Sequence, residues 1–342
     1  MKAARFHEFG NADVIRVEDV PDPVAGPGQV VVRVRAAALN HLDVDIRDGI
    51  SRFPIQLPYI MGIEFAGEVD SVGEGVTGWQ PGDRVAPYIM DTCGHCRYCK
   101  TGRESLCLQP GFVSFSTGGA FAEKVAVSAK TLVRVPDSVS WEAAAALQVA
   151  FGTSWHMLFT RAKLKAGETV MVNAVGSGIG SAAVQLAHIA GAFVIGNASS
   201  QEKLDRAKTF GLDVGINRLT EDIAARVMEI TDGVGVDVVY EHVGGDMFQA
   251  SLDSLTKDGR LVTCGGHAGE VVPFDIIPFF RTQKQVIGSF VYHQDEVQKC
   301  FDLAGRGLIQ PLVHSTFPLA EIADAMRLME AREQFGKIVV VP

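Results

Sequence analysis

Four cysteines fall within one short stretch of the chain, in the run CGHCRYCKTGRESLC. They are Cys93, Cys96, Cys99 and Cys107. The short gaps let neighbouring thiolates converge on one metal ion, and the longer return brings in the fourth sulfur. Four sulfur ligands with no vacant position describe a structural zinc site, because a catalytic zinc keeps one position for water or substrate. Disulfides or free thiols are the alternative, but reducing conditions disfavour disulfides in a protein that is not secreted.

A glycine-rich loop is the second feature with chemical potential. It comprises Gly176, Ser177, Gly178, Ile179 and Gly180, between an apolar run and a helix-like run. Glycine allows a tight turn and a close backbone approach, so a dinucleotide diphosphate could lie on the N-terminus of the helix. The loop is a variant of the G-x-G-x-x-G pattern, so its strand–loop–helix context carries the prediction. A purely structural glycine turn is the alternative.

The end of the next predicted strand indicates which dinucleotide would bind. A site that prefers NAD has an acidic residue there, which holds the ribose 2′-hydroxyl. This chain has NASS at residues 197–200, then Lys203, with Arg218 after the following strand. The hydroxyl groups of Ser199 and Ser200 and the two basic side chains suit a 2′-phosphate, so we expect a preference for NADP(H). The alternatives are that Ser199 caps a helix and that Lys203 is simply solvated.

The elements that must position these residues differ between the two parts of the chain. Up to about residue 135 the sequence reads as short strands broken by glycine and proline, as in 30–39, 65–76 and 81–89. This pattern is typical of a β-rich, barrel-like domain. From about residue 140, continuous apolar strands alternate with amphipathic helices, which indicates a doubly wound parallel sheet.

These patterns predict an α/β protein with two domains. We expect a β-rich catalytic domain over residues 1–149, with the zinc lobe at about 91–110. A Rossmann cofactor-binding domain should occupy residues 150–292, and residues 293–342 should return to the first domain. A chain of 342 residues is long enough for two separate cores.

Composition excludes several classes of function. Hydrophobic residues make up 47% of the chain and charged residues 21%, as in an ordinary globular enzyme. The formal charge of −9 disfavours binding to nucleic acids or anionic membranes, both of which need a basic surface. We expect a cytoplasmic protein, because no signal-peptide pattern and no apolar run of ~18 residues is present.

Together these features resemble the medium-chain dehydrogenase/reductase superfamily, and the resemblance covers essentially the whole chain. It is carried by MKAARFHEFG, GIEFAGEVDSVGEGVTGWQPGDRV, AFAEKVAV and FGKIVVVP, besides the cysteine and glycine motifs. It implies a GroES-like first domain and a nicotinamide-dependent oxidoreductase. Within the superfamily the chain looks like the zinc-type alcohol dehydrogenase-like and quinone oxidoreductase-like proteins.

The sequence departs from its relatives where they hold a catalytic zinc. Zinc alcohol dehydrogenases bind that ion through a cysteine, the histidine of a G-H-E motif, and a cysteine or acid near the first cofactor helix. The corresponding residues are Asn40, Ile63 and about Val149. Isoleucine and valine cannot ligate a metal, so the resemblance implies that the catalytic zinc is absent. A site rebuilt from His41 or Asp45 would lack a third ligand.

The resemblance also implies roles for other residues. Asn40 stands where zinc-free quinone oxidoreductases make a polar contact to nicotinamide or substrate. Asp45 could donate a proton if burial raises its pKa, and an ion pair with a neighbouring arginine is the alternative. His41 and Tyr59 are further candidates for the catalytic cleft. The remaining cofactor contacts that it implies are Thr153, Val243, Gly265, Gly266 and Lys337.

We therefore expect an NADPH-dependent reductase of an α,β-unsaturated carbonyl compound or a quinone. Oxidation of a simple alcohol would lack the metal that polarises its oxygen. Reduction of an aldehyde or ketone is the alternative among enzymes, and a non-enzymatic cofactor-binding or RNA-binding protein is the alternative of another class. The apolar stretch VVPFDIIPFFRTQKQVIGSF suggests a homodimer or homotetramer.

Overall fold

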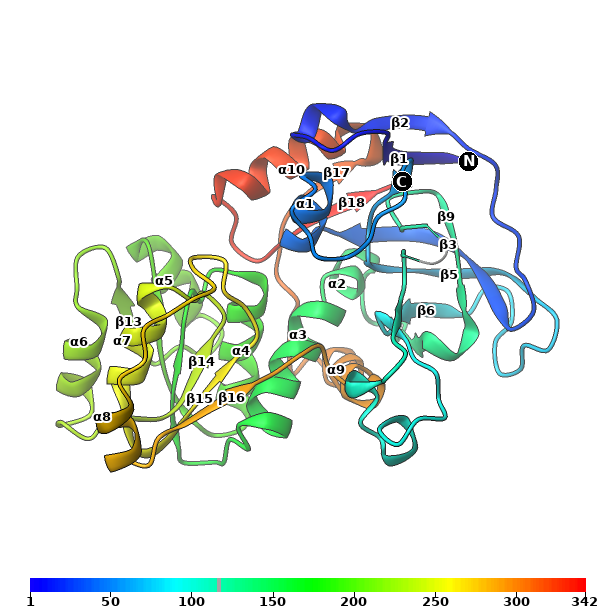
Figure 1. The fold of residues 1–342 in the computed structure, drawn as a ribbon. Helices are drawn as coiled ribbons and strands as arrows, with labels where there is room; N and C mark the ends of the chain where they lie inside the picture. The colour runs from blue at the N-terminus through cyan, green and yellow to red at the C-terminus, as the bar shows by residue number, and fades with distance from the viewer. Residues whose placement is uncertain (116–117) are drawn as a thin grey trace. The chain divides into compact units, whose positions relative to one another are not determined.

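The chain divides into two compact units in the computed structural model, which describes residues 1–115 and 118–342. The first unit comprises Met1–Val149 and His293–Pro342, and the second comprises Ala150–Tyr292 (Figure 1). Each has a sheet and a hydrophobic core of its own. In the part of the chain described, no helix has the length and apolarity needed to cross a lipid bilayer.

A seven-stranded sheet organises the first unit, and β3 lies at its centre, paired with β5, β9 and β18. The alternation of valine and arginine places Val32 and Val34 in the core, with Arg33 and Arg35 exposed. The strands are β3 (Gln29–Ala38), β5 (Glu64–Val72), β6 (Arg84–Pro87), β9 (Lys124–Ser128), β10 (Leu132–Arg134), β17 (Val313–Pro318) and β18 (Lys337–Val341).

Smaller elements complete the first unit. Among the residues that the structure describes, a three-stranded sheet, a two-stranded sheet and four α-helices belong to this unit in addition to the large sheet. The small strands are β1 (Lys2–Phe6), β2 (Arg16–Asp19), β4 (Tyr59–Ile60), β7 (Met90–Asp91) and β8 (Gly111–Phe112). The helices are α1 (His41–Arg47), α2 (Trp141–Ala145), α9 (Gln294–Gly305) and α10 (Ile322–Ala331).

The register of the central strands fixes the candidate site of this unit. Ala38, at the end of β3, lies opposite Glu64 of β5 and opposite Val339 of β18. The residues just after β3 therefore meet the start of β5 and the start of β18. Asn40 and Lys337 come together in this way, although they are far apart in the chain.

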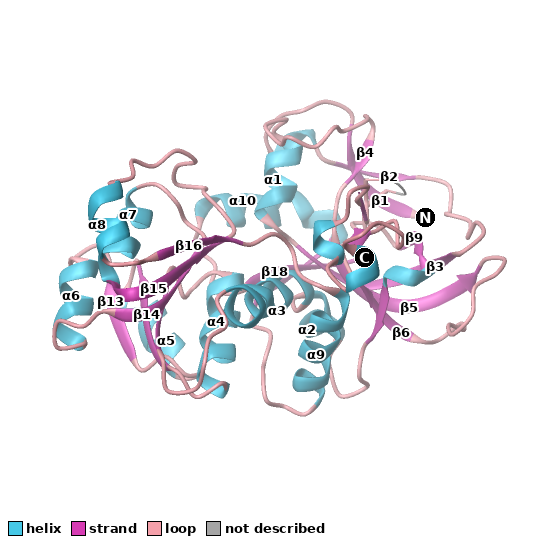
Figure 2. Ribbon diagram, turned by 60° about the horizontal axis from the view of Figure 1, so that its bottom comes forward, coloured by secondary structure: helices cyan, strands magenta, loops and turns pink. Residues whose placement is uncertain are grey.

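The second unit is a six-stranded parallel sheet in the order β13-β12-β11-β14-β15-β16, with helices on both faces (Figure 2). The strands are β11 (Thr169–Val172), β12 (Phe193–Ala198), β13 (Val214–Asn217), β14 (Val236–Glu241), β15 (Leu255–Thr263) and β16 (Gln285–Gly288). The helices are α4 (Gly178–Ile189), α5 (Gln201–Lys208), α6 (Ile223–Ile230), α7 (Asp246–Ser254) and α8 (Ile276–Arg281). The strand order reverses between β11 and β14, and ligands of such sheets bind at the carboxyl ends of the strands beside that point.

The apolar run after Ser140 is divided, although its composition suggests one helix. Ser140 caps α2 by accepting a hydrogen bond from the Ala143 N–H, and α3 (Gln148–Trp155) follows after a short break. The Gln148 side chain donates to the carbonyls of Ala144 and Phe65. The Ala144 carbonyl thus accepts a hydrogen bond from a side chain, and this explains why the backbone hydrogen bonds of the helix are interrupted between α2 and α3.

Candidate functional site

The structure brings the four clustered cysteines together in a lobe between β7 and β8. Their Sγ atoms all lie within 4.8 Å of one another, and those of Cys96 and Cys99 are 3.5 Å apart. Backbone N–H groups point at the sulfurs, as from Cys96 to Cys93 and from Gln109 to Cys107, both at 3.4 Å. Such donors favour thiolates, and four thiolates in this arrangement fit a tetrahedral zinc ion.

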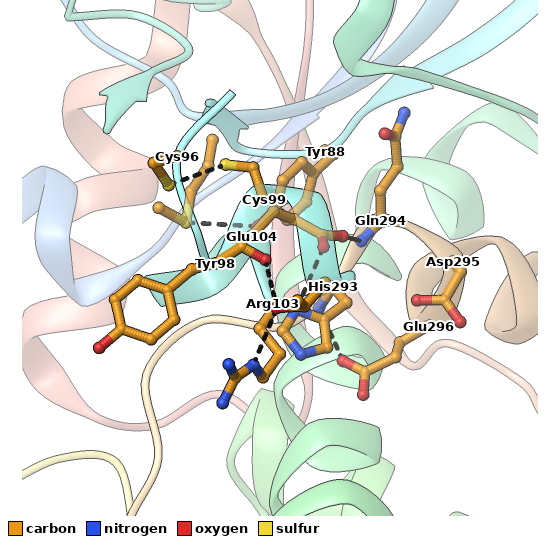
Figure 3. Close-up of polar contacts among 12 residues, drawn as sticks. Tyr88, Cys96, Tyr98, Cys99, Arg103, Glu104, His293, Gln294, Asp295 and Glu296 are labelled. Atoms are coloured by element: carbon orange, nitrogen blue, oxygen red, sulfur yellow. Dashed lines mark hydrogen bonds and ion pairs between the residues drawn. The ribbon is translucent and has the colours of Figure 1, made fainter. Parts of the chain in front are cut away.

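The lobe is fastened to the N-terminus of α9 through Glu104 (Figure 3). Glu104 lies in a single turn of 3₁₀ helix between Cys99 and Cys107, and its Oε1 accepts the Gln294 N–H at 2.8 Å. The Gln294 side chain donates in turn to the backbone carbonyls of Lys130 and Leu132. The cysteine lobe is therefore connected to both β10 and α9, which the sequence spacing alone does not reveal.

A buried polar cluster follows β3 in the first unit. The ammonium of Lys337 donates to the carbonyl of Leu39 at 2.7 Å, to Asn40 Oδ1 at 2.7 Å and to Glu64 Oε2 at 2.8 Å. An ammonium has three donors, so these contacts use all of them. Lys337 is 7% exposed and Glu64 is fully buried, so the ion pair is shielded from water.

Glu64 also bonds to Asn40 and Val149, two of the residues that we expect at the positions of the catalytic zinc ligands of zinc alcohol dehydrogenases. Its Oε1 accepts the Val149 N–H at 2.7 Å, and its Oε2 accepts Asn40 Nδ2–H at 3.1 Å. Ile63 is buried, and its side chain has no atom that could ligate a metal ion. The backbone N–H of Asn40 donates to Asp43 Oδ2 at 2.8 Å, and burial raises the pKa of Asp43 to about 7.

Two other candidate residues of the catalytic cleft, His41 and Asp45, lie in α1. His41 is exposed at the start of this helix, and Asp45 is half-buried in it. The guanidinium of Arg47 contacts Asp48 and Glu330. Elsewhere, the buried Tyr59 hydroxyl bonds to Ser114 Oγ at 3.0 Å, and burial raises the pKa of Tyr59 to about 12. Tyr59 is therefore a neutral phenol at physiological pH.

The glycine-rich loop joins β11 to α4 in the second unit, with Ser177 as the N-cap of the helix. Its Oγ accepts the Gly180 N–H at 2.9 Å, and a Cβ at position 180 would lie 2.3 Å from the Ala174 carbonyl oxygen. Only glycine fits there. Ala174 donates its N–H to Asn197 Oδ1, which braces the loop against β12. The backbone N–H groups of the first turn of α4 make this cradle fit a dinucleotide diphosphate.

The residues expected near the adenosine ribose lie at the carboxyl ends of β12 and β13. Ser200 is the N-cap of α5 and accepts the Lys203 N–H at 3.3 Å. Ser199 and Lys203 are half-buried, and Arg218 has an exposed side chain. The Arg218 N–H donates to the carbonyl of Ala198 at 3.0 Å, so both basic residues flank the end of β12.

Two functional candidates that the sequence did not single out lie at the end of β14. The buried Glu241 accepts the N–H groups of Val243 and Gly244 and the hydroxyl of Thr263, at 2.7, 2.8 and 2.9 Å. It thereby joins the loops after β14 and β15, which contain Val243, Gly265 and Gly266. The next residue, His242, forms a hydrogen bond through its Nε2 with Ser177 Oγ in the glycine-rich loop. The sequence signal for Glu241 is an acidic residue at the end of an otherwise apolar strand.

Thr153, another residue expected near the cofactor, is buried in α3.

Comparison with known proteins agrees with this architecture. The chain matches the alcohol dehydrogenase GroES-like domain over residues 26–137 and the zinc-binding dehydrogenase family over residues 178–306. It is 32% identical to an alcohol dehydrogenase of Geobacillus stearothermophilus, over 99% of both chains. The chain belongs to the medium-chain dehydrogenase/reductase superfamily. It is an NAD(P)-dependent medium-chain oxidoreductase of the zinc-type alcohol dehydrogenase-like and quinone oxidoreductase-like branch.

Other members of the medium-chain superfamily extend this likeness. A quinone oxidoreductase of Pseudomonas aeruginosa is 32% identical over 100% of this chain and 99% of its own. A 2-haloacrylate reductase of a Burkholderia species is 33% identical over 99% and 98%. A crystal structure of an NAD-dependent alcohol dehydrogenase has a TM-score of 0.95 and 34% identity, with full coverage of both chains. The expected superfamily and the GroES-like plus Rossmann fold are thereby confirmed.

Proposed function

We propose that this oxidoreductase uses NADPH to reduce an α,β-unsaturated carbonyl compound or a quinone, without a metal ion at the reacting centre. The arrangement around Glu64 carries this proposal. Its carboxylate bonds to Lys337 and also to Asn40 and the Val149 N–H, two of the positions that we expect to correspond to the catalytic zinc ligands. A dication placed beside the Lys337 ammonium would meet like-charge repulsion and would find no donor on Ile63.

The chemistry of a conjugated acceptor suits such a centre. A bound nicotinamide would supply the hydride, and the conjugated carbonyl of the acceptor can take up the developing charge through hydrogen bonds. Asn40 Nδ2 offers one such donor, because one hydrogen goes to Glu64 at 3.1 Å and the other has only a long contact of 3.4 Å to the Ala38 carbonyl. Lys337 holds the amide oxygen and so sets the orientation of the amide.

Two further groups are assigned to the reaction by this proposal. Asp45, half-buried in α1, is the candidate proton donor, and Tyr59 is a candidate second hydrogen-bond donor because it remains a neutral phenol. Asp45→Asn separates proton delivery by the carboxyl group from delivery by water. A loss of turnover of about 10²-fold is the scale expected for a missing general acid. A small change would assign delivery to water.

The names of the relatives support both conjugated and simple substrates. Quinone oxidoreductase and 2-haloacrylate reductase name acceptors of the proposed kind, and the alcohol dehydrogenases favour reduction of an aldehyde or ketone as the second candidate. Preference for NADPH is proposed from Ser199, Ser200, Lys203 and Arg218, which surround the end of β12 with hydroxyl groups and positive charge.

A substrate panel tests the reaction class. NADPH oxidation is followed with an enal, an enone, a quinone, an enoyl thioester and a saturated ketone, each before and after exhaustive chelation. We expect turnover of at least one conjugated acceptor or quinone to exceed that of the saturated ketone, with no loss on chelation while the thiolate zinc is retained. Rapid oxidation of plain alcohols that a chelator abolishes would overturn the proposal.

We also propose that the chain forms a homo-oligomer through the edge of the parallel sheet. Among the described strands, β16 pairs only with β15, so one side of it is an open edge. Apolar side chains are exposed in β16 and in the neighbouring stretches of the chain, including α8: Ile276, Ile277, Phe280, Val286 and Phe290. An edge strand can pair with its own copy about a two-fold axis. Val286→Lys should lower the mass measured by sedimentation if this edge is the interface, and an unchanged mass would exclude it.

A further inference from the structure

We propose that His242 is a positioning residue for the cofactor: its imidazole donates a hydrogen bond to Ser177 and so directs the Ser177 hydroxyl toward the dinucleotide diphosphate. The inference rests on the proposed binding of a dinucleotide at the glycine-rich loop. It extends that proposal by adding a residue from the neighbouring strand, β14, to the recognition of the diphosphate. The His242 Nε2 lies 3.1 Å from Ser177 Oγ.

The hydrogen-bonding capacity of Ser177 makes this contact decisive. A serine hydroxyl has two acceptor positions and one hydrogen to donate. The Gly180 N–H occupies one acceptor position at 2.9 Å. If Nε2–H of His242 occupies the other, the hydroxyl hydrogen is left for a ligand. If the hydroxyl donates to Nε2 instead, the Ser177 side chain has no hydrogen left to donate to an anion.

An anionic diphosphate selects the first of these arrangements. The hydroxyl of Ser177 lies at the N-terminus of the twelve-residue helix α4, where backbone N–H groups and the helix dipole already favour negative charge. A hydroxyl that donates to a phosphate oxygen forms a charge-assisted bond, which is stronger than a bond to neutral imidazole nitrogen. Donation from His242 into the same oxygen polarises the hydroxyl and strengthens that bond further.

The surroundings of His242 hold its ring in place. The residue is 8% exposed, and its ring meets the Tyr240 ring edge-on with centroids 5.6 Å apart. Glu241 fixes the backbone on its C-terminal side by accepting the N–H groups of Val243 and Gly244. Backbone donors thereby occupy Oε1 of Glu241, and the Thr263 hydroxyl donates to Oε2.

A second connection joins the same two elements. The Tyr240 hydroxyl bonds to Ser154 Oγ at 2.9 Å, and the single hydrogen of Ser154 is shared between the carbonyls of Ala150 at 2.8 Å and of Ile179, in the first turn of α4, at 2.9 Å. The end of β14 is therefore linked to the start of α4 through Tyr240 and through His242. This double link keeps the Ser177–His242 distance defined before any ligand arrives, which lowers the cost of ordering the site on binding.

The test uses four variants of the full chain. His242→Phe keeps the volume of the ring and leaves the Gly180–Ser177 cap intact, and His242→Gln keeps an amide donor near the position of Nε2. Ser177→Ala and the double variant Ser177→Ala/His242→Phe complete a cycle. Dissociation constants for NADPH and NADH are measured by fluorescence, with thermal melts of each ligand-free protein. His188→Phe, at the other end of α4, is the matched control.

We expect His242→Phe to weaken NADPH and NADH about equally, by up to about tenfold, which is the scale for the one hydrogen bond from Ser177 to a charged group that His242 directs. His242→Gln should stay within about threefold of the parent, and the double variant should bind no more weakly than Ser177→Ala alone. The KM for the cofactor should rise while kcat changes little. The control His188→Phe should bind like the parent.

Parent-like binding by His242→Phe, or losses that simply add in the double variant, would overturn the inference. A lower melting temperature with no rescue by His242→Gln would show a packing role and would overturn it as well. Failure of the reaction class is a separate outcome. If the parent binds NADPH but reduces no conjugated acceptor, the proposed reaction is refuted, whereas the proposed role of His242 is unaffected. If the parent binds neither dinucleotide, both the proposed reaction and the proposed role of His242 are refuted.

Discussion

The ammonium of Lys337, the first residue of β18, lies 2.8 Å from the carboxylate of Glu64, the first residue of β5. Neither strand pairs with the other, and β3 runs between them. The ion pair therefore spans the central strand just where Asn40 follows it. It holds the Asn40 amide from both ends, since Lys337 binds Oδ1 and Glu64 accepts from Nδ2.

Removal of one partner should be more harmful than removal of both. Lys337→Met leaves the buried Glu64 without its cation, and we expect a loss of about 3 kcal/mol in the free energy of unfolding. Lys337→Met combined with Glu64→Gln should recover part of that loss. Denaturant unfolding measures both. The exposed pair of Lys299 and Asp295 is the control, and Lys299→Met should cost less than about 1 kcal/mol. Equal losses at both sites would contradict this account.

Asp43 should make the protein less stable as the pH rises. Burial raises its pKa from 3.8 to about 7, so the folded chain binds a proton that the unfolded chain has lost between those values. Stability from this group is therefore complete at about pH 4 and declines as the pH rises to about 7. Asp43→Asn keeps an acceptor for the Asn40 N–H and has no charge to desolvate. Thermal melts should show a larger gain for this variant at pH 8 than at pH 5, and an equal gain at both would refute the assignment.

The cysteine lobe should hold one zinc ion per chain. Cys96→Ser should abolish tight zinc binding and lower the melting temperature. Because Glu104 connects the lobe to α9, amide exchange should also speed up at Gln294, whose N–H it accepts. Cys264→Ser, outside the lobe, is the control and should keep its zinc. Elemental analysis that finds two tightly held zinc ions in the parent would contradict both this prediction and the proposed reaction.

Cofactor preference should depend on the residues around the end of β12. Lys203→Ala and Arg218→Ala should each raise the KM for NADPH by about tenfold, since a charge-assisted contact to the 2′-phosphate is lost. The KM for NADH should change little. Ala198→Asp should shift preference toward NADH, because a carboxylate repels the phosphate and accepts from the ribose. Lys208→Ala, at the end of α5, is the control. Equal losses for both cofactors would indicate a structural role.

Asn40 should affect turnover more than cofactor binding. Asn40→Ala removes the proposed donor to the substrate carbonyl, and we expect kcat to fall by about 10²-fold, with less than a threefold change in the KM for NADPH. His41→Ala, the next residue, should change kcat much less. An equal loss of kcat in both variants would contradict a role for Asn40 in the reaction. A rise in the KM for NADPH that accounts for the whole effect of Asn40→Ala would contradict it as well.

Local sequence determined much of the fold. The valine–arginine alternation of β3 assigns its buried and exposed faces, because side chains of a strand point alternately to opposite sides. The alternation of apolar strands and helices after residue 140 is enough to indicate a parallel Rossmann sheet, since parallel strands need helical crossovers. Gly180 is likewise set by its neighbourhood, where a Cβ would meet the Ala174 carbonyl. The spacing of the four cysteines needs no distant partner either.

Tertiary structure decided which distant residues meet. The continuous apolar run of β18 indicates a buried strand but not its neighbours, so only its pairing with β3 brings Lys337 to Asn40 and Glu64. The cofactor contact that the resemblance implies for Lys337 stays a prediction, and in the structure its three donors are bonded within the first unit.

The Ser177–His242 contact arises in the same way, from the adjacency of β11 and β14 in the parallel sheet. Local sequence could suggest a loop at each position but not that the two loops touch. Strand order and register are set by the packing of whole faces against one another, and no window of neighbouring residues contains that information.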